Sequence, residues 1–130
     1  MDPLLPEEPL ARFIHDKNYY RPSDRSIRHS AFMPARKDKQ VSVFRISGLA
    51  APAIWEIGNR YVATPLRRSL LGRADIKASD PVVVGLQVTP DDNPPRHANI
   101  GGWPEDASKH KLLAIQLAEK ASLRLISDET

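Results

Sequence analysis

The clearest alternation of apolar and polar positions lies at residues 41–46, which read VSVFRI. This run is dense in β-branched and aromatic residues, so it predicts a β-strand. Successive side chains of a strand point to opposite faces, which places Ser42 and Phe44 on the same face. Three other segments also have the pattern of strands: residues 74–78, 82–88 and 122–126. We therefore expect about four strands.

Two longer segments, residues 52–64 and 104–121, carry apolar residues at the spacing of an amphipathic helix. Each begins with proline, which is favoured at the first helical position because its missing N–H would have no partner there. A shorter segment, residues 9–17, also has apolar residues at helical spacing and predicts a two-turn helix near the start of the chain.

The segment over residues 22–40 is rich in proline, serine and charged residues, a composition typical of a loop. We expect residues 1–40 to form an irregular N-terminal arm, residues 41–126 an α+β core and residues 127–130 an acidic tail. The predicted fold is one small α+β domain, in which a mixed or antiparallel sheet of about four strands packs against two main helices.

The composition excludes several classes of protein. The chain has 130 residues, which suits one domain with a single core. It has no cysteine, so disulfides, thiolate metal sites and cysteine nucleophiles are excluded. No apolar run is long enough to span a bilayer, and the first residues, MDPLLPEE, lack the basic start of a secretory signal. We therefore expect a cytoplasmic protein that makes no membrane contact.

Positive charge is concentrated in residues 21–75, which hold eleven basic and four acidic residues in a chain of net charge +3. Tyrosines and cations mix at the start of this region, as in surfaces that bind single-stranded nucleic acid or a protein partner. The candidate partner-binding residues are Tyr19, Tyr20, Arg21, Arg25, Arg28, Arg36, Lys37 and Lys39. The alternative is an arm folded across the body, with its cations in solvent and its tyrosines partly buried.

The best candidate for a ligand site is the segment 94–104, which combines glycines with polar and aromatic residues. Its glycines allow a ligand to approach the main chain, and the helix expected after it has free N–H groups that attract anions. The candidate ligand-binding residues are Arg96, His97, Asn99, Gly101, Gly102 and Trp103. The alternative is a sharp proline-rich corner whose polar side chains bind local backbone.

His97 is also the leading candidate for acid–base chemistry, because histidine titrates near neutrality. Cleavage of a phosphodiester would need a second histidine, for which His29 is the candidate, and a cation such as Arg45 facing the developing charge. Nothing in the spacing brings these three residues together. The alternative for each is an ordinary structural or exposed side chain.

Other kinds of catalytic site have little support in the sequence. Asp91, Asp92 and His97 could together hold a divalent ion, but acidic residues in such a segment are usually turn formers. We predict no metal site and no cofactor. No serine has the glycine spacing of a nucleophile elbow, and no phosphate-binding or dinucleotide motif is present. The sequence therefore predicts no serine nucleophile.

Our leading interpretation is a small, non-enzymatic binding or accessory module. The basic segment 21–75 would contact a larger protein or nucleic-acid partner, and the loop 94–104 would make a second contact or hold a small anionic ligand. The alternative is a small phosphate-chemistry enzyme, a nuclease or nucleotide-transferring domain, that uses His97 with Arg45 or Arg96.

A further alternative is a structural subunit that self-associates through Trp55 or Trp103. The sequence defines neither the partner nor the oligomeric state.

Overall fold

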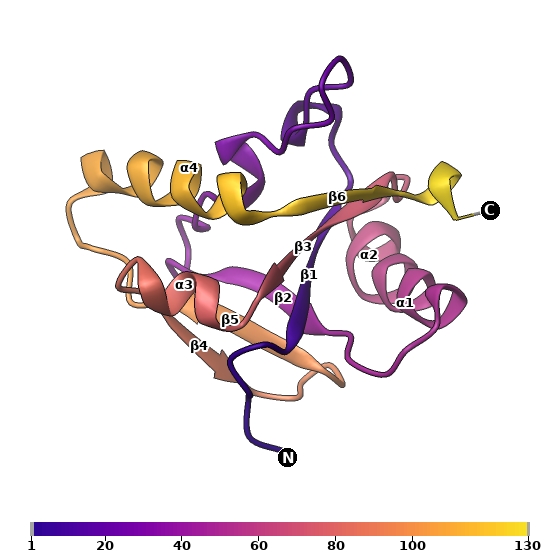
Figure 1. Cartoon of the computed structure of the whole chain (residues 1–130), viewed down its shortest axis with the longest axis horizontal. Coiled ribbons are helices and arrows are strands. Elements are labelled where there is room, and N and C mark those ends of the chain that lie inside the picture. Colours follow the sequence, from indigo (N-terminus) through magenta and orange to yellow (C-terminus); the bar gives the residue numbers. More distant parts are fainter. Residues whose placement is uncertain (1, 130) are drawn as a thin grey trace.

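The computed structural model describes residues 2–129, and these contain a six-stranded sheet in which all neighbouring strands are antiparallel. The strands lie in the order β4-β5-β2-β1-β3-β6 (Figure 1). Their bounds are β1 Pro9–Ile14, β2 Val41–Arg45, β3 Gly72–Lys77, β4 Gln87–Pro90, β5 His97–Gly101 and β6 Ser122–Leu125. The α+β class is confirmed, but the sheet has six strands rather than about four.

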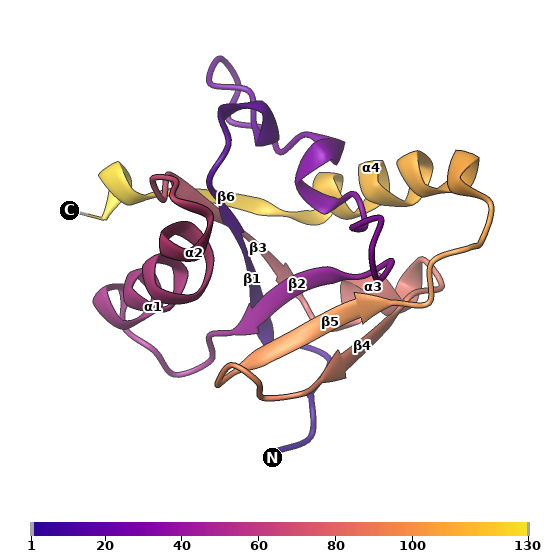
Figure 2. The same ribbon diagram turned by 180° about the vertical axis from the view of Figure 1, so that it is seen from behind.

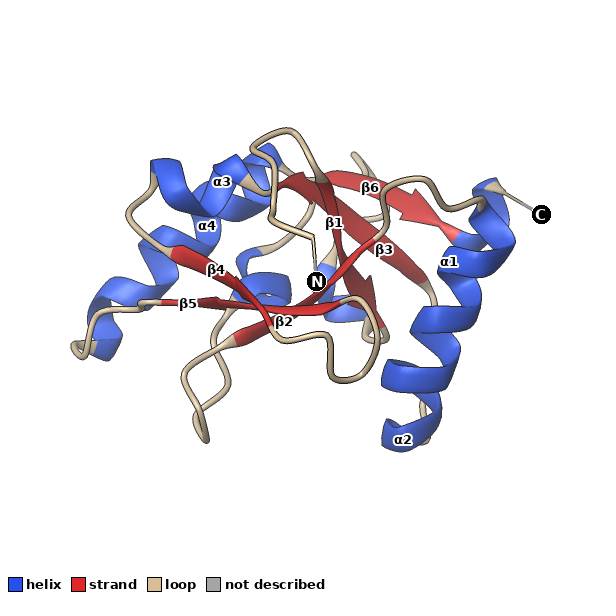
Figure 3. Ribbon diagram, turned by 90° about the horizontal axis from the view of Figure 1, so that it is seen from below, coloured by secondary structure: helices blue, strands red, loops and turns tan. Residues whose placement is uncertain are grey.

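Helices pack on both faces of this sheet. Their bounds are α1 Ala51–Gly58, α2 Thr64–Leu66, α3 Ser79–Val83 and α4 His110–Lys120. A π-helical turn over Asn59–Ala63 joins α1 to α2. Figure 3 shows the pair α1 and α2 at one end of the sheet and the pair α3 and α4 at the other. It also shows that the sheet is strongly twisted, so β4, β5 and β2 run across the direction of β1 and β3.

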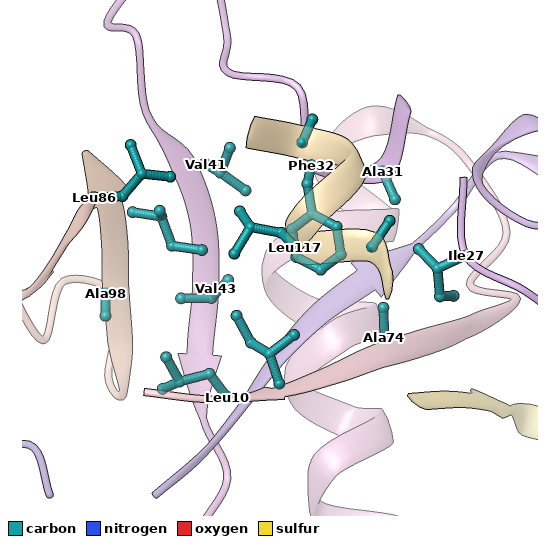
Figure 4. Packing of buried hydrophobic residues seen from close by; sticks show 14 of the residues in the cluster. Leu10, Ile27, Ala31, Phe32, Val41, Val43, Ala74, Leu86, Ala98 and Leu117 are labelled. Atoms are coloured by element: carbon teal, nitrogen blue, oxygen red, sulfur yellow. The ribbon is translucent and has the colours of Figure 1, made fainter. Parts of the chain in front are cut away.

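The larger part of the core lies between the sheet and α4. Phe32, from a short 3₁₀ helix, and Leu117, from α4, lie at its centre and have no exposed surface (Figure 4). A second cluster lies under α1, where the rings of Phe13 and Phe44 have centroids 5.7 Å apart. Side chains of β1 enter both clusters, because alternate residues of a strand face opposite ways.

Residues 9–14 form a strand, so the helix expected there is a wrong prediction. β1 pairs with β2 on one side and with β3 on the other, and both of its faces are buried. A strand buried on both faces carries apolar residues at nearly every position, which is hard to distinguish from a short buried helix. Pro9 fits the observed structure equally well, since the first residue of a strand need not donate a hydrogen bond.

The prediction of a strand over residues 82–88 is also wrong for the first half of that segment. Ser79–Val83 forms α3, and only Gln87–Pro90 pairs with β5. Gly85 has φ +89°, a conformation that favours glycine and turns the chain between the two elements. Val82 and Val83 are 60% and 72% exposed, so this valine-rich segment is not the core strand that its composition suggests.

We predicted that the core begins at residue 41. In the described part of the chain, the sheet already includes residues from the segment expected to be an arm. Residues 9–14 lie in the middle of the sheet, and Ile27 belongs to the core. Near the other end, Asp128 binds Arg25 with 2.6 Å between Oδ2 and Nη2. Of the predicted acidic tail, residue 130 lies outside the described residues. No helix within residues 2–129 is long and apolar enough to cross a membrane.

Candidate functional site

Three polar side chains, Ser42, His97 and Asp91, form a hydrogen-bonded chain on the face of the sheet where β2, β5 and β4 lie side by side. Ser42 lies opposite Asn99 in the ladder between β2 and β5, and His97 lies opposite Phe44. Ser42 and His97 are therefore diagonal neighbours on one face, close enough for side chains to meet.

The loop between β4 and β5 places Asp91 at the far side of the His97 ring. The backbone N–H of Asp91 donates to the His97 carbonyl with 3.1 Å between the heavy atoms, which closes the loop. The Asp91 side chain also accepts the N–H of Asn93 at 3.1 Å, a contact typical of an aspartate in a turn. The same residue therefore shapes the turn and directs a carboxylate at the imidazole.

The two ring nitrogens of His97 have different partners. Nδ1 lies 2.8 Å from Oδ1 of Asp91, and Nε2 lies 2.5 Å from Oγ of Ser42. An ionised carboxylate only accepts hydrogen bonds, so the proton of a neutral imidazole resides on Nδ1. Nε2 is then free to accept the hydroxyl proton of Ser42. This is the order of contacts that serine hydrolases use to activate their nucleophile.

The carboxylate of Asp91 is held in its ionised form. Burial raises its pKa, but hydrogen bonds from His97, the Asn93 backbone and Asn99 outweigh this and leave the pKa below its ordinary value. The amide of Asn99 donates to Oδ2 at 3.0 Å, so the oxygen that does not face the imidazole is also held. An ionised Asp91 stabilises the imidazolium that forms when His97 takes a proton.

Solvent reaches the serine but hardly reaches the histidine. Ser42 is exposed, while the side chain of His97 is 11% exposed and packs edge-on against Phe44, with ring centroids 5.3 Å apart. Phe44 in turn belongs to the second core cluster under α1, so the imidazole rests on a buried ring. Ser42 is thus open to solvent while the imidazole of His97 is shielded from it.

A pocket of about 290 Å³ opens beside Ser42. Arg12 of β1 and Ser42 of β2 both line it. These two strands pair only at Leu10–Arg45 and at Ala11–Phe44, and then diverge (Figure 2). The guanidinium of Arg12 bridges the divergence by donating to the Ser42 carbonyl at 3.1 Å. The residues that line the pocket are Arg12, Tyr19, Met33, Ala35, Asp38, Gln40, Ser42 and Asn99.

The candidate ligand-binding residues of segment 94–104 lie in different surroundings in the structure. His97 and Asn99 belong to the Ser42 site, whereas Trp103 is 7% exposed and donates its indole N–H to the Ile100 carbonyl at 3.0 Å. Trp103 therefore packs in the core and offers no open ring face. Gly101 is partly buried at the end of β5, and Gly102 turns the chain there with φ +79°.

Arg45 and Arg96 line a different pocket, of about 520 Å³, near the N-terminal segment. Arg45 forms an ion pair with Glu8, with 2.5 Å between Nε and Oε2, and donates to the Asp2 carbonyl. The Arg96 side chain donates to the Arg45 carbonyl at 3.3 Å. The imidazole of His97 is instead directed at Ser42, so the structure does not bring His97 and Arg45 together as one phosphate site.

The remaining candidate catalytic residue, His29, begins the 3₁₀ helix over His29–Phe32 and makes no described hydrogen bond or aromatic contact with His97. Asp91 and His97 are in contact, but no group of three or more acidic or histidine side chains among residues 2–129 is arranged to hold a metal ion.

The residues predicted to form a basic, partner-binding arm are only partly exposed. Its two tyrosines, Tyr19 and Tyr20, are half-buried and pack on the larger core cluster. Its cations are all exposed, and within residues 2–129 only Arg25 among them forms an ion pair, with Asp128. The exposed cations are Arg21, Arg25, Arg28, Arg36, Lys37 and Lys39.

Sequence reasoning did not single out Ser42, and it considered Asp91 only as a metal ligand or turn residue. The sequence did predict that Ser42 and Phe44 share one face of their strand. A second strand paired with this one would place its own polar side chains near the Ser42 hydroxyl. That second strand, β5, was expected to be irregular, so this prediction could not be connected to His97.

No protein-family model, curated protein or solved structure matches this chain.

Proposed function

We propose that this protein is a small serine hydrolase that cleaves an ester or thioester, with Ser42 as the nucleophile and His97 as the base. The observation that carries the proposal is the contact of Ser42 Oγ with Nε2 of a histidine whose Nδ1 is bound by Asp91. In this hydrogen-bonded series the serine hydroxyl contacts a base and the base contacts a carboxylate, as nucleophilic catalysis by a serine requires. The proposal departs from the non-enzymatic module favoured by the sequence alone, because the sequence did not join Ser42 to His97.

The reaction would proceed in two steps. Ser42 Oγ attacks the carbonyl carbon while its proton passes to Nε2 of His97, and the bond to the leaving alcohol or thiol breaks as that group takes the proton. Water then attacks the acyl carbon and gives a proton to Nε2. The bond between the acyl carbon and Oγ breaks, and Ser42 regains its proton as the acid leaves.

Two further features support a reactive serine over a purely structural hydrogen bond. Ser42 is an exposed residue that lines a pocket, which gives a substrate access to it, while the carboxylate of Asp91 makes three hydrogen bonds. Gln40 and Asn99 also line this pocket, and Gln40 carries a side-chain amide of the kind that binds a developing oxyanion, whereas the amide of Asn99 donates to Asp91.

Hydrolysis of 4-nitrophenyl acetate tests the proposal on the full chain. We expect turnover by the natural protein and its loss in Ser42→Ala. Ser47→Ala is the matched control, because Ser47 is another exposed serine beyond the end of β2 and its side chain takes no part in the hydrogen-bonded chain. Equal turnover by Ser42→Ala and the natural protein would overturn the proposal.

A second candidate function, binding of single-stranded nucleic acid, is favoured by the exposed cations of residues 21–39. Lys and Arg that neutralise phosphates release counterions, so affinity for an oligonucleotide should fall steeply with added salt. Replacing Arg36, Lys37 and Lys39 together by glutamine should weaken binding and flatten that dependence. Affinity that does not change with salt would exclude this function.

A further inference from the structure

Arg12 differs from Arg45 and Arg73, the other two arginines of the sheet that are at least partly buried, in having no acidic partner. Arg45 is paired with Glu8, and Arg73 is paired with Asp75. Among residues 2–129, no ion pair includes Arg12. Its charge is met only by neutral groups, so this partly buried cation lacks the compensation that such a group ordinarily has.

The contacts of Arg12 hold its guanidinium in place. Nε donates to the Ala31 carbonyl at 2.8 Å, and Nη1 donates to the Ser42 carbonyl at 3.1 Å. Burial lowers the pKa of Arg12 from its ordinary value, and the nearby phenol of Tyr19 partly opposes this shift. Arginine stays protonated at any physiological pH, so the group remains a fixed positive charge.

Arg12 lines the pocket together with Tyr19, Met33 and Ser42, and its guanidinium contacts Ser42 at the backbone carbonyl. The one carboxylate that lines the pocket, on Asp38, already accepts the backbone N–H of Gln40 at 3.1 Å and does not pair with Arg12. The pocket therefore combines a fixed cation, a hydroxyl donor and a small apolar wall.

We infer that this pocket is an anion subsite, in which Arg12 and Tyr19 bind a carboxylate or phosphate group carried by the substrate. The inference rests on the proposed hydrolase in one respect, since it assigns the substrate class: a small ester or thioester with an oxyanion within reach of Ser42. Guanidinium groups bind carboxylate and phosphate through paired N–H donors, which gives both affinity and orientation.

Anion binding is measured on the Ser42→Ala protein, so the result does not depend on catalysis. Acetate, inorganic phosphate and the neutral analogue acetamide are each titrated into the ¹⁵N-labelled full chain. We expect saturable shifts of the Arg12 Nε–H signal and of pocket backbone signals with one or both anions and not with acetamide. The comparison of acetate with phosphate identifies which oxyanion the pocket prefers.

Three variants identify the group that binds. Arg12→Gln should weaken anion binding about tenfold or more, because a hydrogen bond to a charged group is lost. Tyr19→Phe removes only the hydroxyl and should weaken binding less, and it carries the test if Arg12→Gln does not fold. Lys111→Gln, which removes an exposed cation of α4 outside the pocket, should leave the affinity unchanged.

Absence of saturable shifts with either anion, or equal affinity for acetamide, would overturn the subsite. Unchanged affinity in both Arg12→Gln and Tyr19→Phe would also overturn it. These outcomes are separate from the hydrolase test. Anion binding without esterase activity would support the subsite and reject the hydrolase. Esterase activity without anion binding would support the hydrolase and reject the subsite.

Discussion

The Nδ1 nitrogen of His97 lies 2.8 Å from Oδ1 of Asp91, and this contact determines which ring nitrogen faces Ser42. The carboxylate belongs to the loop that ends β4, while the imidazole belongs to the first residue of β5. A turn residue thereby fixes the tautomer of a histidine in the adjoining strand. The proposed role of Ser42 as a nucleophile depends on this arrangement.

Asp91→Asn should abolish most of the activity without unfolding the protein. An asparagine amide can donate to Nδ1, which would place the imidazole proton on Nε2 and remove the acceptor that Ser42 needs. We expect kcat for ester hydrolysis to fall about a hundredfold or more, with a smaller change in KM. Asp92→Asn is the control, since its side-chain oxygen can still accept the Arg96 N–H. A wild-type kcat in Asp91→Asn would contradict the assigned role.

The ion pair of Glu8 and Arg45 should make stability depend on pH. The hydrogen bond from Arg45 is the main cause that lowers the pKa of Glu8 below 4.5, against an opposing effect of burial. Because the folded-state pKa is the lower one, the pair stabilises the fold above pH 4.5 and loses this effect as the pH falls through the lowered pKa. Glu8→Gln should cost about 1 kcal/mol at neutral pH.

Chemical unfolding at a series of pH values measures this dependence. The stability difference between the natural protein and Glu8→Gln should shrink as the pH drops below 4.5. Glu7→Gln is the matched control, because Glu7 pairs with Lys77 on the exposed surface, where such pairs contribute little. A difference that stays constant down to the lowest pH would contradict the prediction.

Gly58→Ala should destabilise the fold although alanine is the better helix former. A Cβ at this position in α1 would lie 2.6 Å from Cδ1 of Phe13 and 2.8 Å from Cδ2 of Leu70. We expect a loss of about 1–3 kcal/mol from overpacking, which outweighs the gain of about 1 kcal/mol in helix propensity. Thermal or urea unfolding gives the sign directly. A stabilised Gly58→Ala would show that α1 does not pack against β1 this closely.

Two leucines of α4 give a matched test of the larger core cluster. Leu117 has no exposed surface, whereas Leu112 is 61% exposed. Leu117→Ala should lower the free energy of unfolding by about 2–5 kcal/mol. Leu112→Ala should change it by less than about 0.5 kcal/mol. Similar losses in the two variants, measured by urea unfolding, would contradict the packing of α4.

The sequence predicted those elements whose patterning is local. β2, α1, β3, α4 and β6 lie where residue spacing placed strands or helices. The errors arose where burial on both faces removed the alternation, as in β1, and where valines occur outside the core, as at Val82 and Val83. Both depend on which elements pack together, and a single sequence does not state this.

The candidate site was predictable only in part. His97 and Asn99 were identified from the chemistry of their side chains, and both lie in the site. Ser42 was not, because its reactivity depends on a pairing of β2 with β5 that brings residues 55 positions apart into contact. A hydrogen bond across strands of unknown register leaves no local motif for sequence analysis to detect.

The most direct test is covalent labelling of the natural protein with a fluorophosphonate, which reacts with activated serine hydroxyls. Mass spectrometry should locate the label on Ser42 and on no other serine, and Ser42→Ala and Asp91→Asn should abolish or strongly reduce labelling. Ser47→Ala should be labelled like the natural protein. Absence of labelling in the natural protein, or labelling that persists in Ser42→Ala, would contradict the assignment of Ser42 as a nucleophile.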